Sequence, residues 1–234
     1  NSYETPLVIL AILIGISPLI IYELGLSLKI NKAMIYALTF AFMFYIGTQN
    51  AIIFLIHDVT LQIPFLLLLF LTLTKRNFRL FCLLLLINLG FKESFSITGI
   101  ALGVGLLFLG NNWRKFAIAS FLISSTYGIL ISYLIIPFFK YTTFGVWGHY
   151  GYRPEFTNPV KMLLLFFNSQ QKLETVLTSL SSFGFLPLFS PVSLILILQD
   201  VTQRFVLQGV TPLRTGLNLY YNANLAVILL FGSF

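Results

Sequence analysis

Residues 80–110 read LFCLLLLINLGFKESFSITGIALGVGLLFLG. Two strongly apolar runs, 80–91 and 94–110, flank the adjacent charged residues Lys92 and Glu93. A charged side chain at bilayer depth costs roughly 2.5–3.5 kcal/mol on insertion scales, so such residues usually face a water-filled cavity or a partner. The stretch therefore predicts two membrane-embedded helices that meet at a polar, functional turn.

The composition of the whole chain agrees with this reading. Of its 234 residues, 58% are hydrophobic and 9% are charged, against about 25% charged in soluble domains. The mean hydropathy is +0.93. We predict an all-α, polytopic integral membrane protein in contact with the lipid bilayer. The net charge of +7 does not indicate nucleic-acid binding, because the basic residues are scattered in short loops, as membrane topology requires.

A helix that spans the bilayer needs about 20 apolar residues. Three runs reach that length: 6–28, 33–56 and 116–139. The runs 60–74, 80–91 and 94–110 are shorter, and later apolar runs are broken by proline or end the chain. We expect seven to nine membrane-embedded segments, several of them short or broken, in one transmembrane domain, 1–234. Because the sequence opens without Met and stops inside an apolar run, we expect it to be a piece of a longer protein.

Basic residues alternate between successive loops. The basic loops are Lys29/Lys32, Lys75/Arg76/Arg79 and Arg114/Lys115. The positive-inside rule places these loops in the cytoplasm and puts residues 47–59, 92–96 and 140–172 on the outer side. Runs of 12 to 16 residues are too short to cross the bilayer, so we expect an indentation from the outer face, walled by protein.

Residues 140–182 form a separate region within this domain. The segment 140–160 is rich in Gly, Pro and aromatic residues and reads as an ordered outer loop at the membrane interface. In 169–182 the residues Leu173, Val176, Leu177 and Leu180 recur at helical spacing. That spacing predicts an interfacial amphipathic helix.

The strongest candidate site residues are two charged or titratable pairs. Lys92 and Glu93 would bind an anionic head group and orient it or act as base, or they would form a structural ion pair at a helix turn. His57 and Asp58 would form a base with its orienting acid or half of a metal site. The alternative is a solvated helix end, since a lone His is poor evidence for a ligand.

Other polar residues are weaker candidates. Arg153 and Glu155 would recognise a phosphate or sugar hydroxyls, or belong to an ordinary polar loop, and the same holds for His149. Asp200 and Arg204 lie at i, i+4 and favour a structural pair, while Tyr220-Tyr221 is typical of an interfacial anchor. No metal site or cofactor is predicted, and a divalent cation is left open. With one cysteine, Cys82, no internal disulfide can form.

Three stretches resemble the domain-of-unknown-function 2079 family of bacterial and archaeal membrane proteins. They are FLIHDVTLQIPFLLLLFLTLTKRNFRLFCLLLLINLGFKESF (54–95), FGFLPLFSPVSLILILQD (183–200) and LNLYYNANLAVILL (217–230). The family typically shows His-Pro-Glu, a proline, a basic turn and Lys-Glu-Asp in this order. Here His57, Pro64, Lys75-Arg76 and Lys92-Glu93 stand at matching places. Asp58-Val59 replaces Pro-Glu, Ser94 replaces the final acid, and Tyr220 stands where the family tends to have His.

That family is similar to the C-type glycosyltransferases, polytopic enzymes that take a sugar from a polyprenyl-phosphate donor on the outer face. The resemblance implies a prokaryotic plasma membrane, a lipid-linked sugar donor, and a catalytic acid in a first outer loop upstream of Asn1. It assigns donor phosphate to Lys92 and Arg153, and positioning of hydroxyls to Glu93, His57 and Glu155. The departures leave a non-catalytic alternative: a transporter of lipid-linked substrates or a structural subunit of a larger membrane complex.

Overall fold

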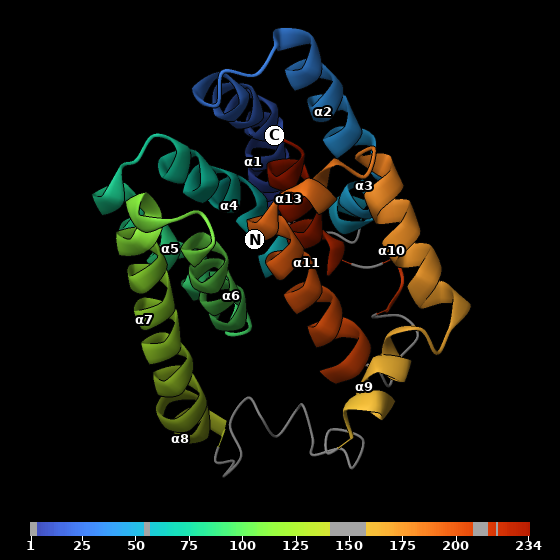
Figure 1. Ribbon diagram of the computed structural model, residues 1–234. Coiled ribbons are helices and arrows are strands. Elements are labelled where there is room, and N and C mark those ends of the chain that lie inside the picture. The colour runs from blue at the N-terminus through green and yellow to red at the C-terminus, as the bar shows by residue number, and fades with distance from the viewer. Residues whose placement is uncertain (1–3, 54–56, 141–157, 208–214, 219) are drawn as a thin grey trace.

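The computed structural model describes residues 4–53, 57–140, 158–207, 215–218 and 220–234 (Figure 1). Every regular element in those ranges is helical, as the composition predicted. The α-helices are α1 (Glu4–Ser27), α2 (Lys32–Phe44), α3 (Ile46–Ile53), α4 (Asp58–Thr74), α5 (Phe78–Phe91), α6 (Phe95–Leu107), α7 (Arg114–Leu130), α8 (Ile136–Lys140), α9 (Pro159–Phe166), α10 (Gln170–Ser182), α11 (Pro191–Thr202) and α13 (Asn222–Ser233). Short turns of other helix types are η1 (Asn111–Trp113), η2 (Ile131–Ile135), η5 (Leu186–Phe189) and η6 (Gln203–Leu207).

The number of spanning helices is lower than the seven to nine embedded segments that we predicted. In the described ranges, only Leu7–Ser27 and Asn111–Phe139 are long and apolar enough to cross a membrane alone. A third span is counted if α2 and α3, which bend by 47° at their junction, are taken together. Four shorter apolar helices, α4, α5, α6 and α13, have 12 to 17 residues each. They are too short to cross about 30 Å as straight helices.

The second and third predicted spans each contain a local irregularity. The break in the second span falls at Tyr45, just before the polar residues at 47–50, and the Tyr45 ring occupies the space beside Gly47. The third span, predicted for 116–139, is formed by α7, η2 and α8, which continue one helix to Lys140. Its π-helical turn, Ile131–Ile135, ends two residues before Pro137.

The short helix α13 forms the centre of the bundle. Its residues are apolar on nearly all sides, and ten of its twelve residues are buried, as expected of a helix that packs against neighbours all round. The Phe231 ring stacks on Phe70 of α4, with ring centroids 4.1 Å apart. Ser193 of α11 donates a hydrogen bond to the Ile228 carbonyl at 3.3 Å.

Serine and amide side chains form hydrogen bonds between α6 and α7 and between α4 and α5. Ser120 of α7 donates to the Gly99 carbonyl of α6 at 2.7 Å. Gln62 of α4 donates to the Asn88 carbonyl and side-chain oxygen, both at 3.2 Å, and Asn88 donates to the Phe65 carbonyl at 3.1 Å. Small residues and interhelical hydrogen bonds are what hold helices together where lipid removes the hydrophobic driving force.

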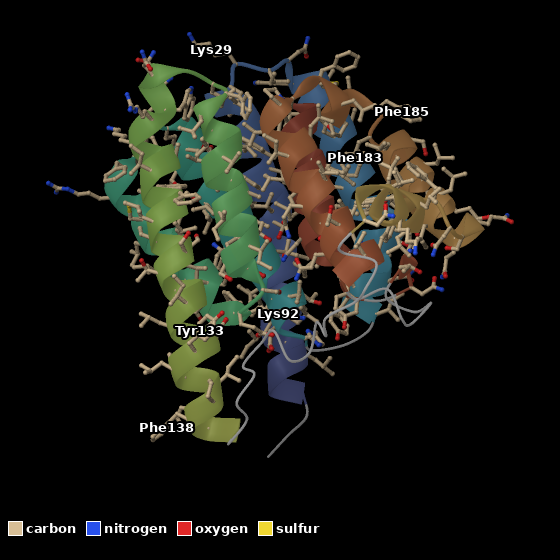
Figure 2. The ribbon with its side chains drawn as sticks, turned by 60° about the horizontal axis from the view of Figure 1, so that its bottom comes forward. Lys29, Lys92, Tyr133, Phe138, Phe183 and Phe185 are labelled. Atoms are coloured by element: carbon tan, nitrogen blue, oxygen red, sulfur yellow. The ribbon has the colours of Figure 1, made fainter. Side chains whose placement is uncertain are left out.

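The basic turns gather at one end of the bundle. Lys75 lies 3.4 Å from Glu23 of α1, and the Arg76 guanidinium lies 4.2 Å from the ring centre of Trp113. Figure 2 shows Lys29 at the end of the molecule opposite Lys92. The turn that carries Lys29 and the turn that carries Lys92 therefore lie at opposite ends of the bundle.

Candidate functional site

A small polar cleft opens at the Lys92 end of the bundle. Its lining combines two cations, one carboxylate, several neutral polar groups and one apolar side chain: Val59, Lys92, Ser94, Thr98, Asp200, Gln203, Arg204, Tyr221 and Asn224. The cleft has a volume of about 40 Å³, and a polar space needs about 10–15 Å³ to hold one water. Segments from four separate parts of the sequence meet here, so the cleft exists only in the folded bundle.

Lys92 reaches this place because α5 stops there. Its backbone is extended (φ −153°, ψ 134°), which ends the helix and turns the chain toward α6. The Lys92 Nζ lies 5.4 Å from the ring centre of Tyr220 and 5.1 Å from that of Tyr221, within the range of cation–π attraction. The side chains of Lys92 and Glu93, which the structure both describes, do not form an ion pair with each other. Glu93 therefore does not neutralise the Lys92 charge by direct contact.

His57 is connected to Lys92 through the same aromatic pair. The imidazole stacks on Tyr220 with ring centroids 3.3 Å apart and an interplanar angle of 15°, and the Tyr220 hydroxyl donates to that of Tyr221 at 2.9 Å. The His57 Nδ1 is buried without a hydrogen-bond partner in the described structure. Burial, followed by the positive charge of Lys92, lowers the pKa of His57 below its ordinary value of 6.5, although Asp58 acts in the opposite direction. Burial and Lys92 together therefore favour the neutral form of the imidazole.

Arg204 supplies the second cation of the cleft from η6. Its side chain is 3% exposed and is fixed by Asp200, 3.4 Å away, and by the Gly216 carbonyl, which accepts at 2.9 Å. The i, i+4 pair that the sequence indicated is thus formed. Lys92 and Arg204 against Asp200 leave the cleft with a net positive charge.

The other predicted site residues do not line the cleft or lie outside the described residues. Glu93 is half-buried in the turn beside Lys92, and Asp58 is exposed in the first turn of α4. Neither lines the cleft. His149, Arg153 and Glu155 lie outside the described residues. Within the part of the chain that the structure describes, no group of three His, Cys, Asp or Glu side chains could hold a metal ion.

Sequence reasoning missed four residues of the site. Arg204 and Asp200 appeared only as a structural pair, although a charged pair next to an apolar run carries the same signal as Lys92. Tyr220 and Tyr221, interpreted as an interfacial anchor, pack against His57 and Lys92 instead. The match of Tyr220 to a position where relatives tend to have His was the signal that could have found them.

Comparison with known proteins assigns the sequence to a family. The chain has no match among curated proteins or among solved structures. The profile of the family described as "Predicted membrane protein (DUF2079)" matches residues 2–234. Because that match covers nearly the whole sequence, the chain belongs to the DUF2079 family of predicted membrane proteins.

Proposed function

We propose that the cleft at Lys92 binds the phosphate of a lipid-linked substrate, and that the protein acts as a glycosyltransferase-like membrane protein on a polyprenyl-phosphate sugar. The observation that carries the proposal is the convergence of Lys92 and Arg204, from segments more than 100 residues apart in sequence, on one polar cleft with a single carboxylate. Lysine and arginine are the residues that bind phosphate in proteins.

The chemistry of the cleft suits a phosphate that carries a hydroxylated group. The Asn224 Oδ1 is buried without a hydrogen-bond partner among the described residues, and it lines the cleft. An amide oxygen in that state costs free energy unless it accepts a hydrogen bond, which a ligand hydroxyl or an ordered water supplies. Ser94 and Thr98 add hydroxyl groups beside it.

The size of the cleft limits which part of a substrate it takes. Pockets for small ligands are commonly about 300–1,000 Å³, and the cleft measures about 40 Å³. The described cleft therefore accommodates the phosphate end of a donor, and the sugar occupies space outside it or requires the walls to separate. Arg153, Glu155 and His149 remain candidates for that part of the site.

The candidate base is His57, with Glu93 as the second candidate. A neutral imidazole with a buried nitrogen that lacks a partner is in the state that a general base requires. Asp200 is already paired with Arg204. In this proposal it orients the Arg204 guanidinium and does not act as a base. The resemblance implies a catalytic acid upstream of Asn1. If transfer depends on that acid and it is absent, the cleft still binds the lipid phosphate but no sugar is transferred. That case is the transporter or structural-subunit alternative.

The test compares Lys92→Met with Lys75→Met in lipid nanodiscs. Both replacements remove one ammonium, but Lys75 lies at the opposite end of the bundle beside Glu23. We expect Lys92→Met to weaken binding of polyprenyl-phosphate sugar at least tenfold, because loss of one phosphate contact of this type costs about 1.5–3 kcal/mol. Lys75→Met should bind like the parent. Equal binding by both variants would contradict the proposal.

Turnover is measured on the same samples to separate the two alternatives. Sugar transfer that falls in both Glu93→Gln and His57→Gln, with donor binding retained, supports a transferase. Donor binding by the parent without transfer to any acceptor supports the non-catalytic alternative.

A further inference from the structure

We propose that a polar groove between α10 and the segment 215–218 binds a neutral carbohydrate. The groove is separate from the Lys92 cleft and has a volume of about 250 Å³. Its described lining contains one carboxylate, neutral polar groups and two apolar side chains: Ile46, Gln171, Glu174, Thr175, Thr178, Gly216, Leu217 and Asn218. The inference does not rest on phosphate binding at Lys92, because it concerns a different cavity and an uncharged ligand.

One face of α10 supplies the polar wall of the groove. Gln171, Glu174, Thr175 and Thr178 follow one another at i, i+3, i+4 and i+7, a spacing that places side chains on the same side of a helix. In Figure 1 α10 lies beside α3, and Ile46 of α3 lines the groove together with these four residues. This polar row of α10 therefore borders a cavity.

Hydrogen bonds hold the opposite wall of the groove in place. The Thr175 hydroxyl donates to the Thr215 carbonyl at 2.8 Å, and the Thr215 hydroxyl donates to the Gln171 side-chain oxygen at 3.2 Å. The Asn50 amide donates to the Leu217 carbonyl at 3.1 Å. Because these bonds fix both walls before a ligand arrives, binding costs less conformational entropy.

Gly216 brings the groove next to the Lys92 cleft. A Cβ added at Gly216 would lie 2.5 Å from the Gln171 Nε2, so glycine lets the amide of α10 approach this closely. The Gly216 carbonyl accepts a hydrogen bond from the Arg204 guanidinium at 2.9 Å, and Arg204 also lines the Lys92 cleft. The two cavities therefore adjoin at this hydrogen bond.

The side chains of the groove suit a ligand with several hydroxyl groups. Its amide and threonine side chains contain both donors and acceptors, and a sugar hydroxyl also donates and accepts. The Glu174 carboxylate only accepts. Gln170 donates to one of its oxygens at 2.6 Å, so that oxygen is held in position while the second one accepts from a ligand hydroxyl. Ile46 and Leu217 offer apolar contact to the carbon faces of a sugar ring.

Charge and size argue against an anion or a metal ion in this groove. The negative charge of Glu174 repels an anion, and no cation in the described lining offsets it. A calcium ion takes about six to eight oxygen ligands at close range, whereas the Gln171 oxygen here already accepts from Thr215. The volume of about 250 Å³ lies just below the range of about 300–1,000 Å³ that is common for small-ligand pockets, which suits a single sugar ring.

The test is photolabelling of the protein in nanodiscs. The probes are glucose, galactose and mannose that carry a diazirine on the sugar, each as a water-soluble methyl glycoside and as a long-chain alkyl glycoside in the bilayer. The variants Glu174→Gln and Thr178→Val are compared with Glu23→Gln and Thr202→Val, which change the same groups at positions that do not line the groove. All variants are first compared with the parent for monodispersity and unfolding temperature.

We expect at least one probe to label α10 saturably, and an excess of the unlabelled sugar to remove the label. The half-saturating concentration should rise at least tenfold in Glu174→Gln and roughly threefold in Thr178→Val, as loss of a charged and of a neutral hydrogen bond predicts. Both controls should label like the parent. Labelling by the methyl glycoside identifies a water-borne sugar, and labelling by the alkyl glycoside alone identifies a sugar carried on a lipid.

Lys92→Met should label like the parent, because a neutral sugar in the groove does not need the ammonium of the cleft. The carbohydrate site and the proposed phosphate site can therefore fail separately. The proposal would be overturned if no probe gave α10 labelling that unlabelled sugar removes. Equal half-saturation in the parent, Glu174→Gln and Thr178→Val would overturn it as well, because the sugar would then bind elsewhere.

Discussion

At the scale of single residues, one aromatic ring lies between a titratable imidazole and a charged ammonium. Tyr220 stacks on His57 and lies under the Lys92 ammonium. The imidazole therefore responds to the charge of a residue 35 positions away in sequence. The pKa of His57 therefore depends on the charges of Lys92 and Asp58.

We expect the His57 imidazole to titrate with a midpoint below 6.5, measured by NMR of ring-labelled histidine. Burial disfavours the charged form, and Lys92 adds repulsion. Lys92→Met should therefore raise the midpoint toward 6.5, while Asp58→Asn should lower it, because Asp58 favours the charged form. A midpoint above 6.5, or shifts of the same sign in both variants, would contradict the stacking geometry.

The same shift has a defined effect on stability. The pKa of His57 is lower in the folded protein than in an unfolded chain, so the unfolded chain binds the proton more readily. The contribution of His57 to folding is fully present above pH 6.5. It is lost as the pH falls through the folded pKa. His57→Gln should remove that pH dependence of the unfolding temperature.

At the scale of elements, the contact between α6 and α7 depends on a missing side chain. A Cβ added at Gly103 would lie 2.8 Å from the Ala117 carbonyl oxygen and 2.9 Å from the Phe121 nitrogen, both backbone atoms that cannot rotate away. Gly103→Ala should destabilise the bundle by about 1–3 kcal/mol, as overpacking does.

Gly90→Ala is the matched control for this change, because nothing lies within 4 Å of its added Cβ. Alanine also suits a helix better than glycine, so Gly90→Ala should be neutral or stabilising by up to about 1 kcal/mol. Thermal unfolding in detergent distinguishes the two. Equal unfolding temperatures for both variants would mean that α6 and α7 do not pack as described.

The second prediction at this scale concerns the attachment of α10. Lys172→Met keeps an unbranched side chain, one atom shorter, but removes the donor to two carbonyls, on α9 and on η6. Loss of charged hydrogen bonds should cost about 1–3 kcal/mol, partly offset by removal of a buried charge. Lys161→Met, on the exposed side of α9, should change little. Proteolysis between α9 and α10, compared for the two variants, reports the local loss.

The sequence predicted helices better than it predicted their surroundings. Apolar runs and basic turns located α1, α4, α5 and α6 to within a few residues, because composition and charge determine both. They could not show that the final apolar run is the centre of the bundle, since lipid and protein give a helix the same apolar pattern. The leucine spacing in 169–182 predicted an amphipathic helix, but it could not show that Lys172, Thr175 and Ser179 of α10 are buried in the protein.

The site was predictable only in part, and the reason is again physical. Lys92 and Glu93 were conspicuous because no apolar run tolerates two charges without a cause. Arg204 and Tyr220 become site residues only when η6 and the start of α13 reach the end of α5, a long-range arrangement that spacing along the chain does not encode.

At the scale of the whole molecule, the two ends differ in structure. One end carries the basic turns, and the other carries the positively charged cleft at Lys92 (Figure 2). The proposed function places the charged head of a lipid-linked substrate at the second end.

The most direct test of the central claim is a cryo-electron microscopy structure of the full-length protein in nanodiscs with a polyprenyl-phosphate sugar. The account predicts density for the phosphate between the Lys92 ammonium and the Arg204 guanidinium, each within salt-bridge distance of it, and disappearance of that density in Lys92→Met. Phosphate density at the basic turns around Lys29 and Lys75, with the Lys92 cleft unchanged, would contradict the account.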